Sequence, residues 1–217
     1  MTRLLLGAVL LGKMSICVIA QGMLAQPAQV RFDSVDYKNL LHWNPPTDNT
    51  SLQYYVQWKI YGEPQWSDVD GCQGIQKHQC DLSDVTSDPR EWYYARVHAS
   101  SLPSRRSAWA LSPRFSPRWD TKISPPGLRL SVRQQGIVVH VKPPRTLVRK
   151  MLSSLRYRIY LIHTSGDEEL FETDGSPHRL TLKDLTHKAR YCLQGQTVIT
   201  SQARSSVRGS LKCVTVL

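Results

Sequence analysis

The sequence predicts an all-β protein built from two sandwich domains in tandem. Short runs of alternating apolar and polar residues are separated by turn residues every 8–15 positions, a spacing that favours β sandwiches. A proline-rich segment divides these runs into two series of similar length. The chain has 217 residues, 41% of them apolar, which is enough for two packed cores of about 100 residues each. One large β domain is the alternative.

The first series spans residues 26–120 and contains five predicted strands. They are Val30–Ser34, Asn39–Trp43, Tyr54–Tyr61, Trp92–Ser100 and Ala108–Phe115. Within the third of them Val56, Trp58 and Ile60 share one face, so we expect this set to point into the core. In the fourth strand the shared face holds Tyr93, Ala95, Val97 and Ala99, which we expect to meet the same core.

The second series spans residues 121–217 and contains six predicted strands. They are Gly127–Val132, Ile137–Val141, Leu155–His163, Arg179–Leu182, Arg190–Val198 and Leu211–Val216. Thr146–Leu155 is the only weak helix candidate. Pro117, Pro125 and Pro126 lie between the two series, where proline gives a stiff, extended connector.

Residues 1–20 are predicted to be a secretory signal peptide. A short basic start is followed by an apolar run and by small residues near Ala20, and the expected cut precedes Gln21, with a second site after Ala25. A buried N-terminal helix is the alternative. After Ala25 no apolar run approaches the ~20 residues of a membrane span. The sequence therefore predicts a secreted, extracellular chain, unless it is the truncated ectodomain of a membrane protein.

The five cysteines favour two disulfides. Removal of residues 1–20 would remove Cys17, and an even count in a secreted chain implies disulfides. Of the three pairings that four cysteines allow, only one keeps each bond within a single domain. It joins Cys72 to Cys80 and Cys192 to Cys213.

Asn49 begins an Asn-Thr-Ser sequon in a polar turn, so we expect it to carry a glycan.

Positive charge is concentrated in the second series. Residues 121–217 hold sixteen basic and six acidic residues, whereas residues 26–120 are nearly balanced. Six of the basic residues crowd one loop and its flanks: Lys142, Arg145, Arg149, Lys150, Arg156 and Arg158. This cluster would suit an acidic partner such as heparan sulfate or an acidic protein. A solvated, solubilising face is the alternative.

Motifs for enzymatic chemistry are missing from the sequence. It contains no nucleophile elbow, zinc-protease motif, phosphate loop or dinucleotide fingerprint. The seven histidines are scattered, with none paired at metal-ligand spacing. The basic residues are not interleaved with stacking aromatic residues. We therefore predict a protein that is no enzyme, needs no metal or other cofactor, and binds no nucleic acid.

Aromatic residues supply the best binding candidate. Tyr61 lies off the core face at a strand end, and Gly62 after it lets a partner approach the backbone. Packing of Tyr61 across its own sheet is the alternative.

Trp92 and Arg96 share a face by alternation. We therefore hypothesise that Arg96 stacks on tryptophans as a cation–π pair, drawing on Trp66, Trp92, Trp109 and Trp119; core packing of these rings is the alternative.

The same residues resemble the first domain of the class II cytokine receptors. The likeness rests on ordered motifs, namely residues 30–34, 39–43 and 57–66, then Gly71-Cys72, residues 80–83, Tyr93 to Val97 and Pro113-Arg114-Phe115. Within the family the resemblance is strongest to the receptors that bind interleukin-22. The second domain matches more loosely, chiefly through Arg190-Tyr191-Cys192 and Cys213.

The resemblance implies two fibronectin type III-like (immunoglobulin-like) modules that meet at an elbow and hold an interleukin-22-like helical cytokine. The family's contact loops fall on Lys59, Tyr61 and Gly62, on Ser87 and Asp88, on Arg114 and Phe115, and in the second domain on residues 175–178 and on Ser201 to Arg204. The family's disulfide pattern agrees with the pairing above. Soluble members of the family sequester cytokine, which implies a decoy role. A truncated membrane receptor and a glycan-binding adhesion module are the alternatives.

Overall fold

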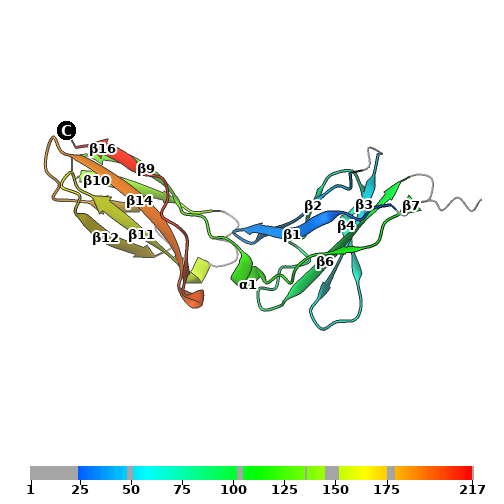
Figure 1. Ribbon diagram of the computed structural model, residues 1–217. Coiled ribbons are helices and arrows are strands. Elements are labelled where there is room, and N and C mark those ends of the chain that lie inside the picture. Colours follow the sequence, from blue (N-terminus) through cyan, green and yellow to red (C-terminus); the bar gives the residue numbers. More distant parts are fainter. Residues whose placement is uncertain are drawn as a thin grey trace, which may run out of the picture.

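The computed structural model consists of two β sandwiches in tandem, joined by a short connector (Figure 1). It describes residues 24–47, 51–101, 105–134, 136–144, 152–174 and 179–216. The predicted signal peptide, the sequon at Asn49, the loop 175–178 and most of the weak helix candidate lie outside the described residues. The prediction of an all-β fold of two sandwiches is confirmed.

Domain 1 packs a three-stranded sheet against a five-stranded sheet. The first sheet has the order β1 (Ala28–Val35), β2 (Lys38–Asn44), β5 (Gln79–Asp81). The second has the order β4 (Ser67–Ile75), β3 (Gln53–Ile60), β6 (Tyr93–Ser101), β7 (Arg105–Arg106). A further strand of this sheet, β8 (Ala110–Leu111), also pairs directly with β6. All named pairs of strands are antiparallel.

The core of domain 1 follows the predicted alternation. Val56 is fully buried, and Trp58 and Ile60 become half-buried as β3 leaves the core. The four predicted core residues of β6 are all buried: Tyr93, Ala95, Val97 and Ala99. Leu24, which precedes β1, also belongs to this cluster and is only 3% exposed.

The predicted strand Ala108–Phe115 is wrong over most of its length. Only β8 forms a regular ladder with β6 there, and Phe115 adds an isolated bridge to Tyr93. Two serine hydroxyls explain the interruption, because Ser107 Oγ accepts the Ala99 N–H and Ser112 Oγ accepts the Ala95 N–H. Side chains thereby satisfy donors of β6 that a continuous partner strand would otherwise pair.

Domain 2 repeats the two-layer arrangement. One sheet has the order β13 (Arg179–Leu182), β10 (Gly136–Lys142), β9 (Gly127–Arg133). The other has the order β12 (Glu168–Asp174), β11 (Leu155–Ile162), β14 (Arg190–Ile199), β15 (Arg204–Ser205), with β16 (Lys212–Thr215) also on β14. The core lies between the layers, and Tyr157, Ile159 and Leu161 are buried in it as the alternation predicts.

Five strands of the structure were not predicted from the sequence: β4, β5, β7, β12 and β15. β7 and β15 have only two residues each. Gly71 and Gly74 interrupt the alternation of β4, and both adopt positive φ at its bulged pairing with β3. β5 is only three residues long. β12 carries acidic residues at most of its outward positions and buries no side chain fully, so it lacks the apolar period that marks a strand.

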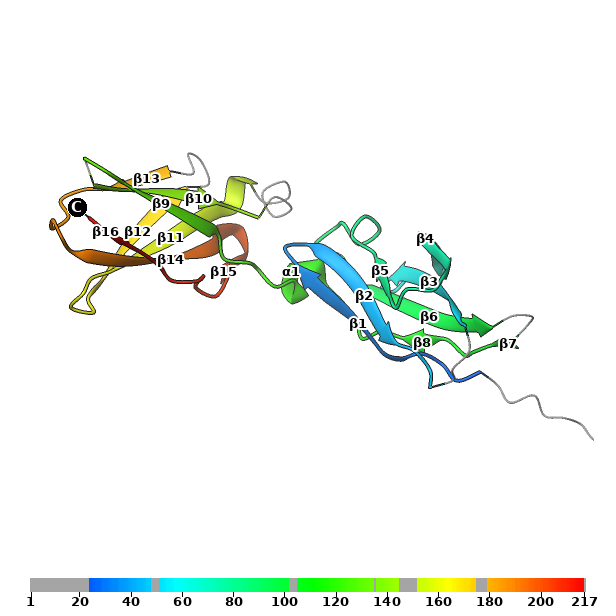
Figure 2. The same ribbon diagram turned by 90° about the horizontal axis from the view of Figure 1, so that it is seen from above.

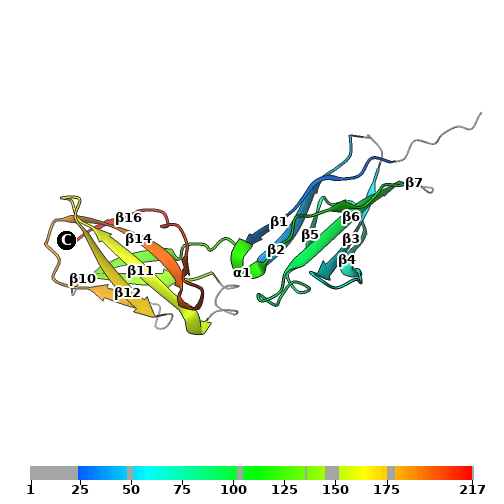
Figure 3. The same ribbon diagram turned by 60° about the horizontal axis from the view of Figure 1, so that its bottom comes forward.

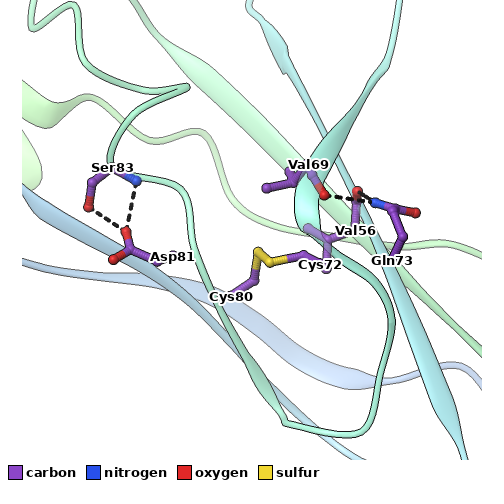
Figure 4. Close-up of a disulfide and its surroundings, with 7 residues drawn as sticks. All are labelled: Val56, Val69, Cys72, Gln73, Cys80, Asp81 and Ser83. Carbon is purple, nitrogen blue, oxygen red and sulfur yellow. Dashed lines mark hydrogen bonds between the residues drawn. A yellow bond between two sulfur atoms is a disulfide. The ribbon is translucent and has the colours of Figure 1, made fainter.

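Both predicted disulfides are present. Cys72 on β4 bonds to Cys80 on β5, so this bond links the two sheets of domain 1. Figure 4 shows Gln73 beside it, whose Nε2 donates to the Val56 and Val69 carbonyls and holds the bulged part of β4 against β3. Cys192 and Cys213 face each other in register on β14 and β16. Disulfides of this kind typically stabilise a domain by about 2–4 kcal/mol.

The two domains meet through a small buried cluster and are inclined to each other, with α1 (Pro117–Asp120) at the bend (Figures 2 and 3). Tyr37 of domain 1 and Ile123 of the connector pack with Leu155 and Ile199 of domain 2. The connector is tied to both sides, because Thr121 Oγ1 accepts the Tyr37 N–H and the Thr197 hydroxyl donates to the Ser124 carbonyl.

Gly136 is the residue whose replacement should most directly disturb the sheet of β9, β10 and β13. Its φ is +121°, and an added Cβ would lie 1.9 Å from the Leu182 carbonyl oxygen. We expect Gly136→Ala to lower the free energy of unfolding by about 2 kcal/mol or more, because overpacking adds to the backbone strain. Urea unfolding of the full chain measures this loss.

Gly166→Ala is the matched control, because Gly166 has φ +94° but no atom within 4 Å of the added Cβ. It should lose only about 1 kcal/mol, the cost of the left-handed backbone alone. Equal losses in the two variants would contradict the close contact between β10 and β13.

Candidate functional site

The candidate binding site begins with Tyr61, which follows β3 at the end of domain 1 that faces the connector. Its side chain is 56% exposed. The guanidinium carbon of Arg114 lies 5.5 Å from the centre of the Tyr61 ring and 4.2 Å from that of Trp92. Tyr94 approaches from the other side, 6.1 Å between ring centres. Two predicted residues, Tyr61 and Arg114, are therefore brought together on an aromatic support.

Backbone hydrogen bonds hold this cluster in place. The Tyr61 N–H donates to the Trp92 carbonyl, and Tyr93 and Phe115 exchange two backbone hydrogen bonds. Gly62 has φ +91°, and no atom lies within 4 Å of where its Cβ would be. The strand end is therefore fixed, while the backbone beside Tyr61 stays open to a partner.

Lys59 supports the turn after Tyr61. Its ammonium group donates to the Glu63 carbonyl at 3.0 Å and lies 5.1 Å from the centre of the Trp66 ring. The side chain is half-buried. Lys59 thus closes the turn from one side and begins a row of stacked side chains on the outer face of the sheet.

That row confirms the predicted stacking of Arg96. Its guanidinium lies between Trp66 and Trp109, at 4.2 and 4.3 Å from the two ring centres. Gln57 Oε1 accepts two hydrogen bonds from the same guanidinium, which fixes its plane. Each such contact is worth roughly 0.5–2 kcal/mol. The stack therefore stiffens the surface of β3 and β6 that ends at Tyr61.

Ser87 and Asp88 lie in the loop that precedes β6. Ser87 is exposed, whereas Asp88 is half-buried and engaged with Arg90 through both side-chain and backbone hydrogen bonds. Those hydrogen bonds lower the pKa of Asp88 to about 2. The buried Tyr93 hydroxyl donates to the Asp88 carbonyl. This loop is therefore anchored to β6, beside the Tyr61 cluster.

Phe115 has a structural position. It is buried and stacks on Phe32 at 4.2 Å between ring centres. The two neighbours therefore have different roles. Arg114 contacts the exposed Tyr61 ring, whereas the buried Phe115 holds the segment that leads into α1.

Domain 2 contributes the turn between β14 and β15. Ser201 is exposed in the 3₁₀ turn Thr200–Gln202. Arg204 is half-buried, and its guanidinium donates to the carbonyls of Arg118 and Thr121 across the junction. The charged group of Arg204 is therefore engaged by the connector and clamps the two domains together. Gln202 adds hydrogen bonds with the Tyr37 hydroxyl.

Three aromatic residues near the junction were not among the site residues predicted from the sequence. Trp92 and Tyr94 support Tyr61, and their outward position was visible in the alternation of β6. Trp119 in α1 is 51% exposed beside Arg118, whose guanidinium carbon lies 4.9 Å from its ring. A four-residue helix leaves no periodic signal in a sequence, so Trp119 was named there only as a candidate stacking ring and not as a residue of the site.

Among the described residues, no helix is long and apolar enough to cross a membrane. No cluster of three or more metal-ligating side chains occurs in that part of the chain either.

Comparisons with known proteins match both domains. A family model described as tissue factor matches residues 1–109, and one described as interferon-alpha/beta receptor, fibronectin type III, matches residues 121–216. Interleukin-22 receptor subunit alpha-2 of Mus musculus is 32% identical over 200 residues, which cover 87% of this chain and 86% of that protein. The Homo sapiens protein of that name is 30% identical, covering 88% and 89%.

Two more distant relatives extend the comparison. Interleukin-20 receptor subunit alpha of Homo sapiens is 30% identical over 226 residues, which cover 99% of this chain but 40% of that protein. The crystal structure of the chicken interferon gamma receptor alpha chain superposes with a TM-score of 0.79 at 21% identity, covering 89% of this chain and 98% of that one. This last likeness is one of fold.

The clamp formed by Arg204 can be tested by removing its donors. We expect Arg204→Met to loosen the junction, because the Arg118 and Thr121 carbonyls lose charge-assisted hydrogen bonds worth about 1.5–3 kcal/mol each. Small-angle X-ray scattering should show a broader distribution of maximum dimensions for the Arg204→Met variant than for the parent chain, because the two domains would sample more orientations. Arg208→Met is the control, because Arg208 pairs with Glu168 within domain 2. An unchanged scattering curve for Arg204→Met would contradict the clamp.

Proposed function

Because this chain belongs to the class II cytokine receptor family, we propose that it binds an interleukin-22-like helical cytokine at its domain junction and withholds it from the signalling receptor. The family is non-enzymatic, and the chain accordingly acts by binding alone. The names of the alpha-2 relatives support interleukin-22, and those of other relatives extend the cytokine class to interleukin-20.

The observation that carries this proposal is the exposed cluster of Tyr61, Arg114 and Trp92. Tyrosine, tryptophan and arginine are the residues that most often dominate protein interfaces. Here the arginine is held between two rings, so its side chain loses little freedom on binding. Ser201 adds an exposed group from domain 2, and Trp119 adds one from α1 at the bend.

The junction supports the proposal because it ties a turn of domain 2 to the connector that follows domain 1. The buried cluster around Tyr37 and the Arg204 clamp hold the turn at Ser201 relative to domain 1. A specific interface buries about 1,600 Å², and nanomolar affinity corresponds to about −12 kcal/mol. Preorganised loops leave more of that energy for affinity.

Inhibition follows from mass action once the cytokine is bound. The signal peptide predicted in residues 1–20 supports a secreted protein that competes for cytokine outside the cell. The alternative is the extracellular part of a membrane receptor, such as the alpha-1 relatives.

Tyr61 should be a hot spot for cytokine binding. We expect Tyr61→Ala to weaken the complex by at least ~2 kcal/mol, because it removes the exposed centre of the aromatic cluster and leaves the core untouched. Surface plasmon resonance with immobilised interleukin-22 measures the dissociation constant. Leu170→Ala is the matched control, since Leu170 is 52% exposed on β12 of domain 2. An unchanged dissociation constant for Tyr61→Ala would remove Tyr61 from the site.

The decoy role predicts competition in a cellular assay. Full chain added to the medium of cells with an interleukin-22 reporter should shift the cytokine dose–response curve to higher concentration. The shift should grow with the amount of chain added, and Tyr61→Ala should reduce it. If the chain binds interleukin-22 but does not shift the cytokine dose–response curve, the decoy role is contradicted and cytokine binding still stands. Retention on the surface of the expressing cells would favour the membrane receptor.

A further inference from the structure

The two outer faces of domain 2 differ in how their charges are compensated. On the sheet of β11, β12, β14 and β16 four basic side chains have an acidic partner in a neighbouring segment, whereas Arg190 on β14 and Lys212 on β16 form no ion pair with a described residue. The pairs are Arg156–Asp174 at 3.1 Å, Arg158–Glu172 at 2.7 Å, His163–Glu169 at 2.8 Å and Arg208–Glu168 at 2.9 Å. Arg156 and Arg158, which the sequence grouped with a free basic cluster, therefore belong to a compensated face.

The opposite sheet, formed by β9, β10 and β13 (Figure 2), carries positive charge without such partners. Its core-facing side chains include Leu128, Leu130, Ile137 and Val139, which assigns the alternate residues to the outside. The outward basic residues are Arg129, Arg133, His140, Lys142 and Arg179, and we call this group the basic face. The outward positions of β9, β10 and β13 include no acidic residue, and none of the five forms an ion pair with another described residue.

The register of the strands concentrates this charge. Arg129 on β9 and Arg179 on β13 both lie directly opposite His140 on β10. Because neighbouring strands are about 4.8 Å apart, the three backbones fall within about 10 Å. Lys142 follows two positions along β10, about 7 Å away on the same side. Arg129, Arg179 and Lys142 therefore place like charges near one another on one face, and an external anion bound across them would reduce their mutual repulsion.

The shape and composition of the basic face select one class of anion. The exposed large apolar residues of the described chain all lie elsewhere, so this face lacks the apolar centre of a protein interface. It has no aromatic side chain on which a nucleic-acid base could stack. What remains is a surface with arginines that can bind oxyanions in a bidentate manner. Such a surface fits a linear chain of sulfate groups read by charge alone.

We propose that the basic face of domain 2 binds a sulfated polysaccharide of the heparan sulfate type. This activity is independent of cytokine binding, because the Tyr61 cluster belongs to domain 1 and no residue of the basic face takes part in it. A protein held in this way would be retained in the sulfated matrix around cells and would act close to its place of release.

The test compares two triple variants that lose the same formal charge. In Arg129→Gln/Lys142→Gln/Arg179→Gln the basic face is neutralised, whereas in Arg156→Gln/Arg158→Gln/Arg208→Gln the loss falls on the compensated face. We expect the first variant to bind a size-defined heparin oligosaccharide about 10-fold more weakly at physiological salt, with a shallower dependence of affinity on salt. The second should bind like the parent chain. Isothermal titration calorimetry measures both.

Equal losses in the two variants would overturn the proposal, because net charge alone would then explain the binding. Binding of polyglutamate as tight as that of heparin, or equal binding of desulfated heparin, would overturn it too. If the first variant does not fold, acetylation of the parent chain gives the answer, since bound heparin should protect Lys142 but not Lys77 of domain 1. Surface plasmon resonance with interleukin-22 should be unchanged for the first variant, so failure of either activity is seen separately.

Discussion

The contact between the two domains is the constraint on which the candidate site depends. Tyr37, Ile123, Leu155 and Ile199 form a cluster too small to hold two domains by apolar burial alone. The polar groups around it complete the joint, because Arg204 donates to connector carbonyls and Thr121 accepts the Tyr37 N–H. Without this joint the loops at Tyr61 and at Ser201 would belong to two separately moving bodies, and a partner would have to order them.

Burial decides which polar contacts matter for this rigidity. Thr121 and Asn39 are fully buried, and Ser34 links them through hydrogen bonds of 2.8 and 2.6 Å. A buried polar group that loses its partner costs about 1–3 kcal/mol, so this network tolerates little change. The ion pairs on β11 and β12 of domain 2 are solvent-exposed, and pairs of that kind contribute about 0–1 kcal/mol each. They compensate charge more than they hold the fold.

Alternation predicted most strands, because the cores of β3, β6 and β11 are built from the apolar residues of a period of two. It failed where the period was broken by Gly71 and Gly74, or where serine hydroxyls replaced ladder carbonyls. The alternation of side chains between the two faces of a strand predicted that Tyr61 is exposed, and the family resemblance indicated Arg114. The role of Arg204 could not be predicted, because its acceptors are backbone carbonyls 83 and 86 positions away in sequence. Sequence patterns describe side chains and carry no record of such acceptors.

The burial of Leu24 links packing to maturation of the chain. This side chain fills part of the core of domain 1 although it precedes the first strand. A leader peptidase that cuts before Gln21 would leave it in place, whereas a cut after Ala25 would release a domain with an unfilled cavity. Loss of a buried leucine side chain costs about 2–5 kcal/mol. The choice between the two predicted cut sites would thus set the stability of domain 1 as well as the N-terminal residue of the chain.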